Sequence, residues 1–536
     1  MTDLPELIAH MERSNDLSRR TMLAYGTALA ALPLAARAQA PDRKPAFKAN
    51  PFSLGVASGD PDATSVVLWT KLAPDPLDPS GGLGREITPV GWEIAEDEGM
   101  KAVVGRGIAA ATPQFGHSVH VEAKGLKPAR WYWYRFHAGD AVSPLGRTRT
   151  MPAPESTPDK LKFSFVSCQH YEQGLYTAYS QMMKDDLDLV IHLGDYIYEY
   201  PGAEKRVRKH SGPKDGKIKT LADYRERHMQ YRADPLLHGM HALCPWLVTW
   251  DDHEFDNNYA SDIQEQQAKG KPRASVAQFL VRRAAAYQAY YEMMPLRARS
   301  LPRGPDMKLY RTASFGRLAE FFVLDTRQYR TDQPNGDGLK PLNAEALKES
   351  NTLLGKEQRG WLESKLLASE ATWNVLAQQV MMGMVGRAMR DGGVGYSMDQ
   401  WPGAAAERIA LAEFLHDRSV PNPVVLTGDI HTNWVNDLRI DDRKTETPIV
   451  ATEFVGTSLS SGGAGQKEFK GLDALLAANP CVKFHNRERG YVRCTVTPGK
   501  WQSDYVVCED VQKPGGLVTT RASFTVEAGK PGAVKS

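Results

Sequence analysis

The sequence predicts an α/β fold preceded by a small antiparallel β-sandwich. From Leu161 onward, short apolar runs alternate with helical stretches such as Val276 to Glu292 and Glu357 to Leu367, which is typical of sheets with helices on their faces. Before that point, runs of strand-forming residues are separated only by turns. The chain has 536 residues, too many for one ordinary core, so we expect two domains plus peripheral segments.

The composition is that of an ordinary globular protein, with 42% hydrophobic and 24% charged residues. The formal net charge is only +2. Nucleic-acid binders usually carry a clear basic excess, so we expect no nucleic-acid binding module. Outside the N-terminus no apolar run reaches the roughly 20 residues that span a bilayer, so we expect no transmembrane anchor after processing.

Residues 1–40 resemble an export signal. Arg19 and Arg20 precede a mildly apolar run from Met22 to Ala36, which ends at the small-residue pattern Ala38-Gln39-Ala40. Paired arginines in this position are typical of twin-arginine signals, which pass folded proteins to the twin-arginine export machinery. The alternative is an amphipathic helix that stays attached. Export predicts a periplasmic or secreted protein.

The five cysteines allow more than one interpretation. Cys481, Cys494 and Cys508 lie near the C-terminus and can contribute one disulfide in an oxidising compartment, whereas Cys168 and Cys244 lie apart. Spacing alone leaves the pairing open.

We expect residues 41–151 to form the antiparallel β-sandwich. Strand runs are expected at 65–70, 91–95, 118–121 and 131–136, with turn residues between them. No catalytic constellation occurs there. The proline-rich stretch 152–158 reads as a linker. A second domain is expected over 160–529, followed by a tail at 530–536.

Polar clusters follow several buried strands of this second domain. They are Ser167-Cys168, Gly194-Asp195, Asp251-Asp252-His253, Asp325-Thr326-Arg327 and Thr427-Gly428-Asp429. In α/β folds ligands gather beyond the carboxyl ends of the strands. We therefore expect these clusters to converge on one site.

The first two acidic clusters suit metal ions. Asp195 and Tyr198 are three residues apart after a flexible glycine, and one carboxylate can bridge two cations. A turn or helix-capping aspartate is the structural alternative. The adjacent carboxylates of Asp251 and Asp252 repel unless a cation neutralises them, although a solvated acidic loop remains possible. We expect Asp252 to be a ligand, His253 a proton donor or phosphate contact, and Asp251 an orienting residue.

Asp429 and His431 stand two residues apart, so in an extended segment both point the same way toward neighbouring ions. Cys168 is either a buried structural thiol or a ligand. A thiolate beside a phenolate and an imidazole suits trivalent iron better than magnesium.

As a set, these motifs resemble the PhoD family of alkaline phosphatases. The segment from Phe52 to Pro61 resembles the start of that family's N-terminal β domain, and Arg489 to Arg493 and Thr520 to Phe524 resemble its C-terminal part. The resemblance thus covers about Phe52 to Gly529. It implies a calcineurin-like metallophosphoesterase β-sandwich flanked by helices, similar to that of purple acid phosphatases.

The resemblance also implies one Fe(III) and Ca(II) ions. Cys168, Asp195, Tyr198 and His431 would bind iron, with Asp195 bridging to calcium. Asp252 and Asp429 would hold calcium, and Arg208 falls where the family offers a phosphate-binding arginine. Purple acid phosphatases have Asn and His at the places of Asp252 and Asp429, and their V-x-x-H motif has no clear match near Gln378 and Gln379. Oxygen ligands in place of nitrogen favour hard ions such as calcium.

The expected activity is hydrolysis of phosphate monoesters and diesters, small molecules attacked in line at phosphorus by activated water. Two alternatives stay open. One is a phosphodiesterase or phospholipase D acting on lipid or teichoic-acid-like diesters. The other is a calcium-dependent envelope binding protein without catalysis.

Overall fold

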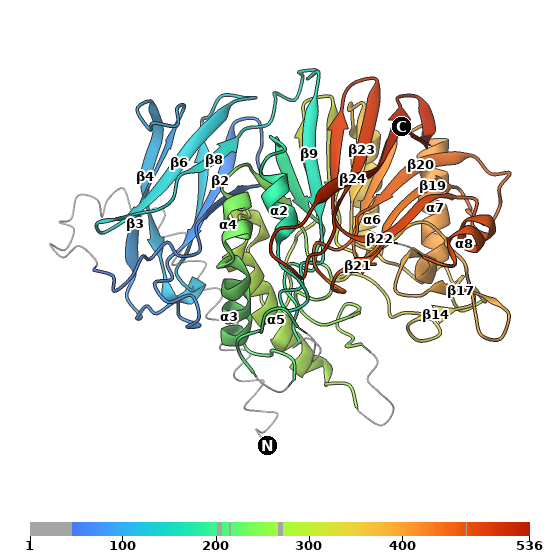
Figure 1. Cartoon of the computed structure of the whole chain (residues 1–536), viewed down its shortest axis with the longest axis horizontal. Coiled ribbons are helices and arrows are strands. Elements are labelled where there is room, and N and C mark those ends of the chain that lie inside the picture. The colour runs from blue at the N-terminus through green and yellow to red at the C-terminus, as the bar shows by residue number, and fades with distance from the viewer. Residues whose placement is uncertain (1–45, 201–205, 214–215, 266–271, 468) are drawn as a thin grey trace.

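Three parallel strands form the centre of the fold, β9 (Leu161–Val166), β10 (Leu189–His192) and β11 (Trp246–Val248). β10 pairs with β9 on one side and with β11 on the other. The computed structural model describes residues 46–200, 206–213, 216–265, 272–467 and 469–536 (Figure 1). Helices and parallel strands alternate around this centre, which confirms the predicted mixed α/β class.

The central strands belong to a long first sheet that is antiparallel toward both of its ends. Its order is β5-β2-β1-β11-β10-β9-β22-β23-β24-β25. The other members are β1 (Val56–Gly59), β2 (Ser65–Lys71), β5 (Ser118–Lys124), β22 (Val482–Val496), β23 (Lys500–Cys508), β24 (Val518–Glu527) and β25 (Lys530–Lys535).

A second sheet packs against the first. Its order is β12-β13-β15-β18-β20-β19, and β22 joins the two sheets because its first half pairs with β19 and its second half with β9 and β23. The members are β12 (Arg311–Phe315), β13 (Ala319–Val323), β15 (Trp373–Ala377), β18 (Pro423–Thr427), β19 (Asn433–Arg439) and β20 (Ile449–Val455).

The strands are apolar on both faces because each sheet is covered twice. Phe163 and Ile191 of the first sheet meet Phe321 and Val375 of the second in one buried core. Their chain neighbours point outward, since side chains alternate along a strand. Val166 and Val190 pack with α2–α5, and Phe322, Leu376 and Val425 pack with α6 and α7. The result is a layer order of helices, sheet, sheet and helices.

The helices are named in chain order. They are α2 (Thr177–Met182), α3 (Leu221–Arg232), α4 (Pro235–His241), α5 (Val276–Met293), α6 (Gly355–Ala368), α7 (Ala405–Asp417) and α8 (Leu472–Ala478). Short 3₁₀ turns lie at Pro113–Phe115, Ala298–Ser300 and Trp401–Ala404. A small peripheral sheet contains β14 (Leu339–Lys340), β16 (Arg387–Ala388) and β17 (Val394–Ser397), and β21 (Gly465–Gln466) pairs with β22.

The N-terminal part contains a five-stranded antiparallel sheet packed on β1, β2 and β5. These three strands are not separate from the rest of the molecule, because β1 continues the first sheet through β11. In Figure 1 this part, in blue, lies beside α3–α5. The five strands are β3 (Thr88–Ala95), β4 (Val103–Ala111), β6 (Trp131–Ala138), β7 (Ala141–Val142) and β8 (Gly146–Arg149).

The structure describes the C-terminal end of the chain but not residues 1–40. Residues 530–536, expected as a tail, contribute β25, which pairs with β24 and extends the first sheet. The export signal expected at residues 1–40 lies outside the described residues.

All five cysteines are described, and each is buried and free, so the possible C-terminal disulfide is not formed. Among the described residues, no helix combines the length and apolar character of a bilayer span.

Buried ion pairs fasten the N-terminal strands to the rest of the chain. Asp60, at the end of β1, accepts a hydrogen bond from Arg311 Nε at 2.8 Å. Its backbone carbonyl accepts from Arg297 Nε at 3.0 Å. Both arginines are less than one-tenth exposed, so neither charge has water as an alternative partner.

We predict that Asp60→Ala lowers the free energy of unfolding by about 3–5 kcal/mol, because it leaves a buried guanidinium without its carboxylate. The midpoint of urea unfolding measures the change. Glu86→Ala, at an exposed position, is the matched control and should leave the midpoint in place. An Asp60→Ala midpoint equal to that of the control would show that the buried contacts of Asp60 do not stabilise the fold.

Candidate metal centre and catalytic site

The loops after β9, β10, β11 and β18 meet at one end of the two sheets. Their side chains form three groups in which the possible ligand atoms lie within 4.8 Å of one another. The groups share members, because Asp195 belongs to the first and second and Asp252 to the second and third. They are Cys168 with Asp195 and His431, Asp195 with Asp252 and His253, and Asp251 with Asp252 and Asp429.

Four of the six predicted metal ligands have left-handed backbone conformations. The φ angles are +59° at Cys168, +57° at Asp195, +64° at Asp429 and +54° at His431. Such angles are uncommon for residues with a side chain and cost free energy, and they cluster at functional sites. The chain thus turns sharply after β9, β10 and β18, which directs these side chains to the same place.

Two glycines allow the loops to approach closely. Gly194 has φ +108°, and a Cβ there would lie 2.4 Å from the backbone nitrogen of Asp251. A Cβ on Gly428 would lie 2.6 Å from Ser167 Oγ. No larger residue fits at either place without moving a ligand-bearing loop.

Backbone hydrogen bonds hold the loops together. The N–H of Cys168 donates to Gly194 O, and the N–H of Gln169 donates to Asp195 O, both at 3.1 Å. Ser461, in the segment after β20, donates from its hydroxyl to Cys168 O at 2.8 Å. The position of Cys168 is therefore fixed by two other loops.

Tyr198 lies between Asp195 and His431. Its hydroxyl donates to Asp195 Oδ2 at 2.8 Å and lies 3.1 Å from His431 Nε2. It also lies 2.6 Å from Ser461 Oγ. Burial and the nearby Asp195 carboxylate raise the pKa of the Tyr198 phenol well above its usual value, so its deprotonation requires a compensating positive charge.

The carboxylates repel one another in a site that is largely closed to water. Burial raises the pKa of Asp195 well above its usual range, and Asp252 raises it further against the opposing His253. Burial and Asp251 do the same for Asp429 against Arg327. Two like charges 4 Å apart repel by about 4 kcal/mol at an effective dielectric constant of about 20. Positive charge is therefore required if these groups are to ionise together.

Several buried oxygens at the site have no hydrogen-bond donor within the described part of the chain. They are Asp195 Oδ1, Asp251 Oδ2 and Asp252 Oδ1. Buried polar atoms are normally paired, and an ion is one of the accepted explanations for those that are not. The three residues that carry these oxygens all belong to the three ligand groups. The donor set therefore fits metal binding.

The donor set divides into two kinds. Around Asp195 it offers a thiol, a phenol and an imidazole, from Cys168, Tyr198 and His431. Around Asp252 it offers carboxylate oxygens. Burial, with Arg489 beside it, lowers the pKa of the partly exposed His431 to about 3, so its imidazole is neutral and able to act as a ligand.

Arg327 is a site residue whose role the sequence did not reveal. Its fully buried guanidinium donates to Asp251 Oδ1 and, at 2.7 Å, to Asp399 Oδ1. Its Nη2 lies 3.6 Å from both Asp252 and Asp429. The available signal was its place in a polar cluster after β13. Ser461 is a second site residue that the sequence did not reveal. It also lies in a polar segment that follows a strand, in this case β20.

His253 and Asp251 occupy different surroundings. His253 Nδ1 lies 2.7 Å from Glu199 Oε2, and burial disfavours its charge. The carboxylates of Asp252, Asp195 and Glu199 outweigh that effect and raise the pKa of His253 well above its usual value. Asp251 is directed toward Arg327, and burial raises its pKa to about 7. This position suits the orienting role expected for Asp251.

Arg208, the predicted phosphate contact, has several partners within the protein. Its guanidinium donates to Asp234 Oδ2, to Tyr171 O at 3.0 Å and to Gly174 O at 2.8 Å, and it stacks on Tyr171 at 3.9 Å. All three of its nitrogens are thus used in fastening a loop to the start of α4. A phosphate contact by Arg208 stays a prediction.

Gln378 and Gln379 also have structural roles. Gln379 accepts from the Thr326 backbone N–H at 3.0 Å and donates to Thr249 Oγ1 at 2.9 Å, which links three strand ends. Gln378 donates to Thr427 Oγ1 at 2.7 Å. Both side chains brace the loops rather than join the three ligand groups.

Comparisons with known proteins place the chain in a family. Residues 163–505 match the family model described as PhoD-like phosphatase, and residues 36–152 match its N-terminal domain. Alkaline phosphatase D of Bacillus subtilis (strain 168) is 51% identical over 493 residues, covering 91% of this chain and 83% of that protein. A solved structure of PhoD superposes with a TM-score of 0.87 at 51% identity, covering 92% of this chain and 93% of that one.

Both family models and the identity over most of the chain confirm the predicted family and enzyme class. The chain belongs to the PhoD-like phosphatase family and is a metal-dependent phosphoesterase.

Proposed function

We propose that the enzyme hydrolyses phosphate monoesters and diesters with one Fe(III) and Ca(II) ions held by adjacent ligand groups. The observation that carries this proposal is the sharing of Asp195 and Asp252 between overlapping groups. Shared carboxylates are typical of centres in which two or more cations lie side by side. When bound, such ions lower the pKa of water and neutralise charge on the phosphoryl oxygens.

The ligand types support the choice of metals. Cys168, Asp195, Tyr198 and His431 form a set with thiolate, phenolate and imidazole donors, which suits trivalent iron. Asp252 and Asp429 add hard oxygen donors, which suit calcium. Asp195 would belong to both sets. We do not propose a calcium-dependent binding protein without catalysis, because the chain belongs to a family of phosphatases.

His253 is the proposed proton donor to the leaving oxygen. Its ring is held by Glu199, and the neighbouring carboxylates raise the pKa of His253, which favours its protonated form. Asp251 is the proposed positioning residue. It holds Arg327, whose guanidinium in turn lies beside Asp252 and Asp429.

We further propose that the two packed sheets with helices on both sides are a calcineurin-like metallophosphoesterase sandwich. Support comes from the layer order and from the gathering of site residues at the strand ends. We also propose export by the twin-arginine route to the periplasm or outside the cell. Arg19, Arg20 and the pattern at residues 38–40 support this.

Turnover of chromogenic esters tests the function. We expect protein purified without chelator to release p-nitrophenol from both p-nitrophenyl phosphate and bis-p-nitrophenyl phosphate. Dialysis against a chelator should abolish both activities, and iron with calcium should restore them. Full turnover after chelation would contradict metal dependence, whereas cleavage of the diester alone would favour the phosphodiesterase alternative.

We predict that Asp195→Asn removes iron and calcium together, because Asp195 belongs to two ligand groups. We expect kcat/KM to fall by more than about 100-fold, the upper end of the losses seen for outer ligand partners. Elemental analysis of the purified variant measures the metals. Asp140→Asn, at an exposed position, should retain wild-type metal content. Full metal content in Asp195→Asn would refute the bridging role.

We predict that Glu199→Gln moves the alkaline limb of the pH–kcat/KM profile to lower pH. The Glu199 carboxylate raises the pKa of His253, so its neutral isostere lets the imidazolium lose its proton earlier as pH rises. Asp256→Asn is the control. Lys217 Nζ lies 2.9 Å from Glu199 Oε1 and 2.8 Å from Asp256 Oδ1, so both carboxylates share this lysine, but only Glu199 pairs with His253. An unmoved limb in Glu199→Gln would exclude His253 as the proton donor.

A further inference from the structure

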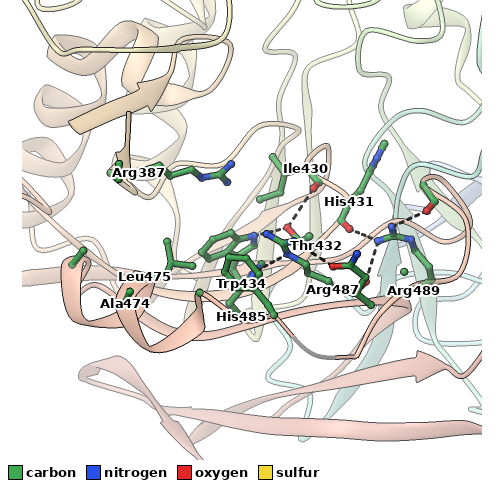
Figure 2. A pocket seen from close by; sticks show the side chains of 18 residues that line it. Arg387, Ile430, His431, Thr432, Trp434, Ala474, Leu475, His485, Arg487 and Arg489 are labelled. Carbon is green, nitrogen blue, oxygen red and sulfur yellow. Dashed lines mark hydrogen bonds between the residues drawn. The ribbon is translucent and has the colours of Figure 1, made fainter. Parts of the chain in front are cut away.

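A pocket of about 660 Å³ opens beside the predicted metal ligand His431. Its volume lies within the roughly 300–1,000 Å³ typical of small-molecule sites. It lies between β19, the second half of the β20–β22 connection including α8, and the β16 hairpin. Figure 2 shows His431 and Ile430 on one side and α8, with Ala474 and Leu475, on another.

Three arginines line this pocket. Arg487 and Arg489 come from β22, and Arg387 comes from β16 on the side away from Arg489 (Figure 2). None of the lining residues that the structure describes is acidic. Within the described residues these three arginines form no ion pair, in contrast to Arg327 at the ligand groups.

Strand geometry explains the one-sided charge. Arg487 and Arg489 are two residues apart in β22, so they point to the same face, with His485. Glu488 between them points to the opposite face, where it accepts from Arg521 Nε at 2.6 Å. The carboxylate nearest in sequence is therefore unavailable to neutralise the pocket.

The arginines are held in place by neutral groups. Arg489 is 7% exposed, and it donates to the carbonyls of Gly463 at 3.1 Å and Gly462 at 3.2 Å, as well as to His431 O. The Arg487 guanidinium stacks 3.7 Å over the Phe469 ring. Three cations around one pocket repel one another, and a bound anion would offset that repulsion.

We propose that this pocket is a subsite for a second phosphate group on the arm of the substrate that extends beyond the scissile phosphorus. The inference rests on the proposed function, because it places the scissile phosphoryl group at the metal ligands. His431 belongs both to the ligand groups and to the pocket wall, so a substrate at the metal centre has this pocket beside it.

The subsite selects for charge on the extended arm. Guanidinium groups bind phosphate through paired, charge-assisted hydrogen bonds, which Arg387 and Arg487 can offer. All three nitrogens of Arg489 already donate to backbone carbonyls, so Arg489 contributes its positive charge. The apolar side of the pocket, from Ile430, Ala474 and Leu475, contacts the uncharged part of the arm. Diesters that carry a further phosphate are therefore preferred over diesters with two neutral arms.

A matched pair of substrates tests the subsite. The p-nitrophenyl ester of thymidine 5′-phosphate is compared with the same compound carrying a 3′-phosphate, by initial release of p-nitrophenol. We expect the 3′-phosphate to raise kcat/KM by about tenfold in the wild-type enzyme, the effect of one charge-assisted hydrogen bond. In Arg387→Gln/Arg487→Gln the ratio should fall to about one.

Arg390→Gln is the control, since Arg390 is exposed in the same hairpin but does not line the pocket. It should keep the wild-type ratio. A wild-type ratio of one, or an unchanged ratio in the double variant, would overturn the subsite.

A binding measurement separates this inference from the proposed function. Titration calorimetry on chelator-treated protein, which should not hydrolyse these monoesters, should show thymidine 3′,5′-bisphosphate binding about tenfold more tightly than thymidine 5′-monophosphate without the substitutions, with no difference in the double variant. This result does not require turnover. An inactive enzyme with this binding preference would contradict the proposed function and support the subsite, whereas an active enzyme without it would do the reverse.

Discussion

The mutual repulsion of buried carboxylates is the constraint on which the rest of the site depends. Asp195, Asp251, Asp252 and Asp429 all lie within overlapping groups whose ligand atoms are less than 4.8 Å apart. Arg327 supplies one fixed positive charge beside three of them, and His253 supplies another when protonated. The remaining negative charge, together with oxygens that lack donors, requires cations. Bound metal ions would neutralise this charge and pair with these oxygens.

The fold meets this constraint by placing four strand ends together and by turning the chain sharply after β9, β10 and β18. Left-handed conformations at Cys168, Asp195, Asp429 and His431 are costly locally, so the surroundings must hold them. Hydrogen bonds between loops, such as those of Cys168 and Ser461, provide that support. The long strand β22 joins both sheets and also carries Arg489 to the back of His431.

Much of this arrangement could be predicted from local patterns. Apolar runs that end in Asp195, Asp252 and Asp429 indicated both the strands and the convergence of their ends. A basic residue in a loop has no periodic signal, so only the fold shows that Asp234 is a partner of Arg208. Arg327 and Ser461 followed strands as the ligands did, but their contacts span distant parts of the chain. Likewise, no local pattern shows that β1 pairs with β11 or that residues 530–535 form a strand.

Anomalous X-ray scattering from crystals of protein purified without chelator would test the central claim most directly. The account predicts an iron-specific peak in contact with Cys168 Sγ, Tyr198 Oη and His431, and a second cation peak beside it in contact with Asp252 and Asp429. Asp195 should touch both. An electron-density map with water alone among these side chains, or a single ion bound at another place, would contradict it.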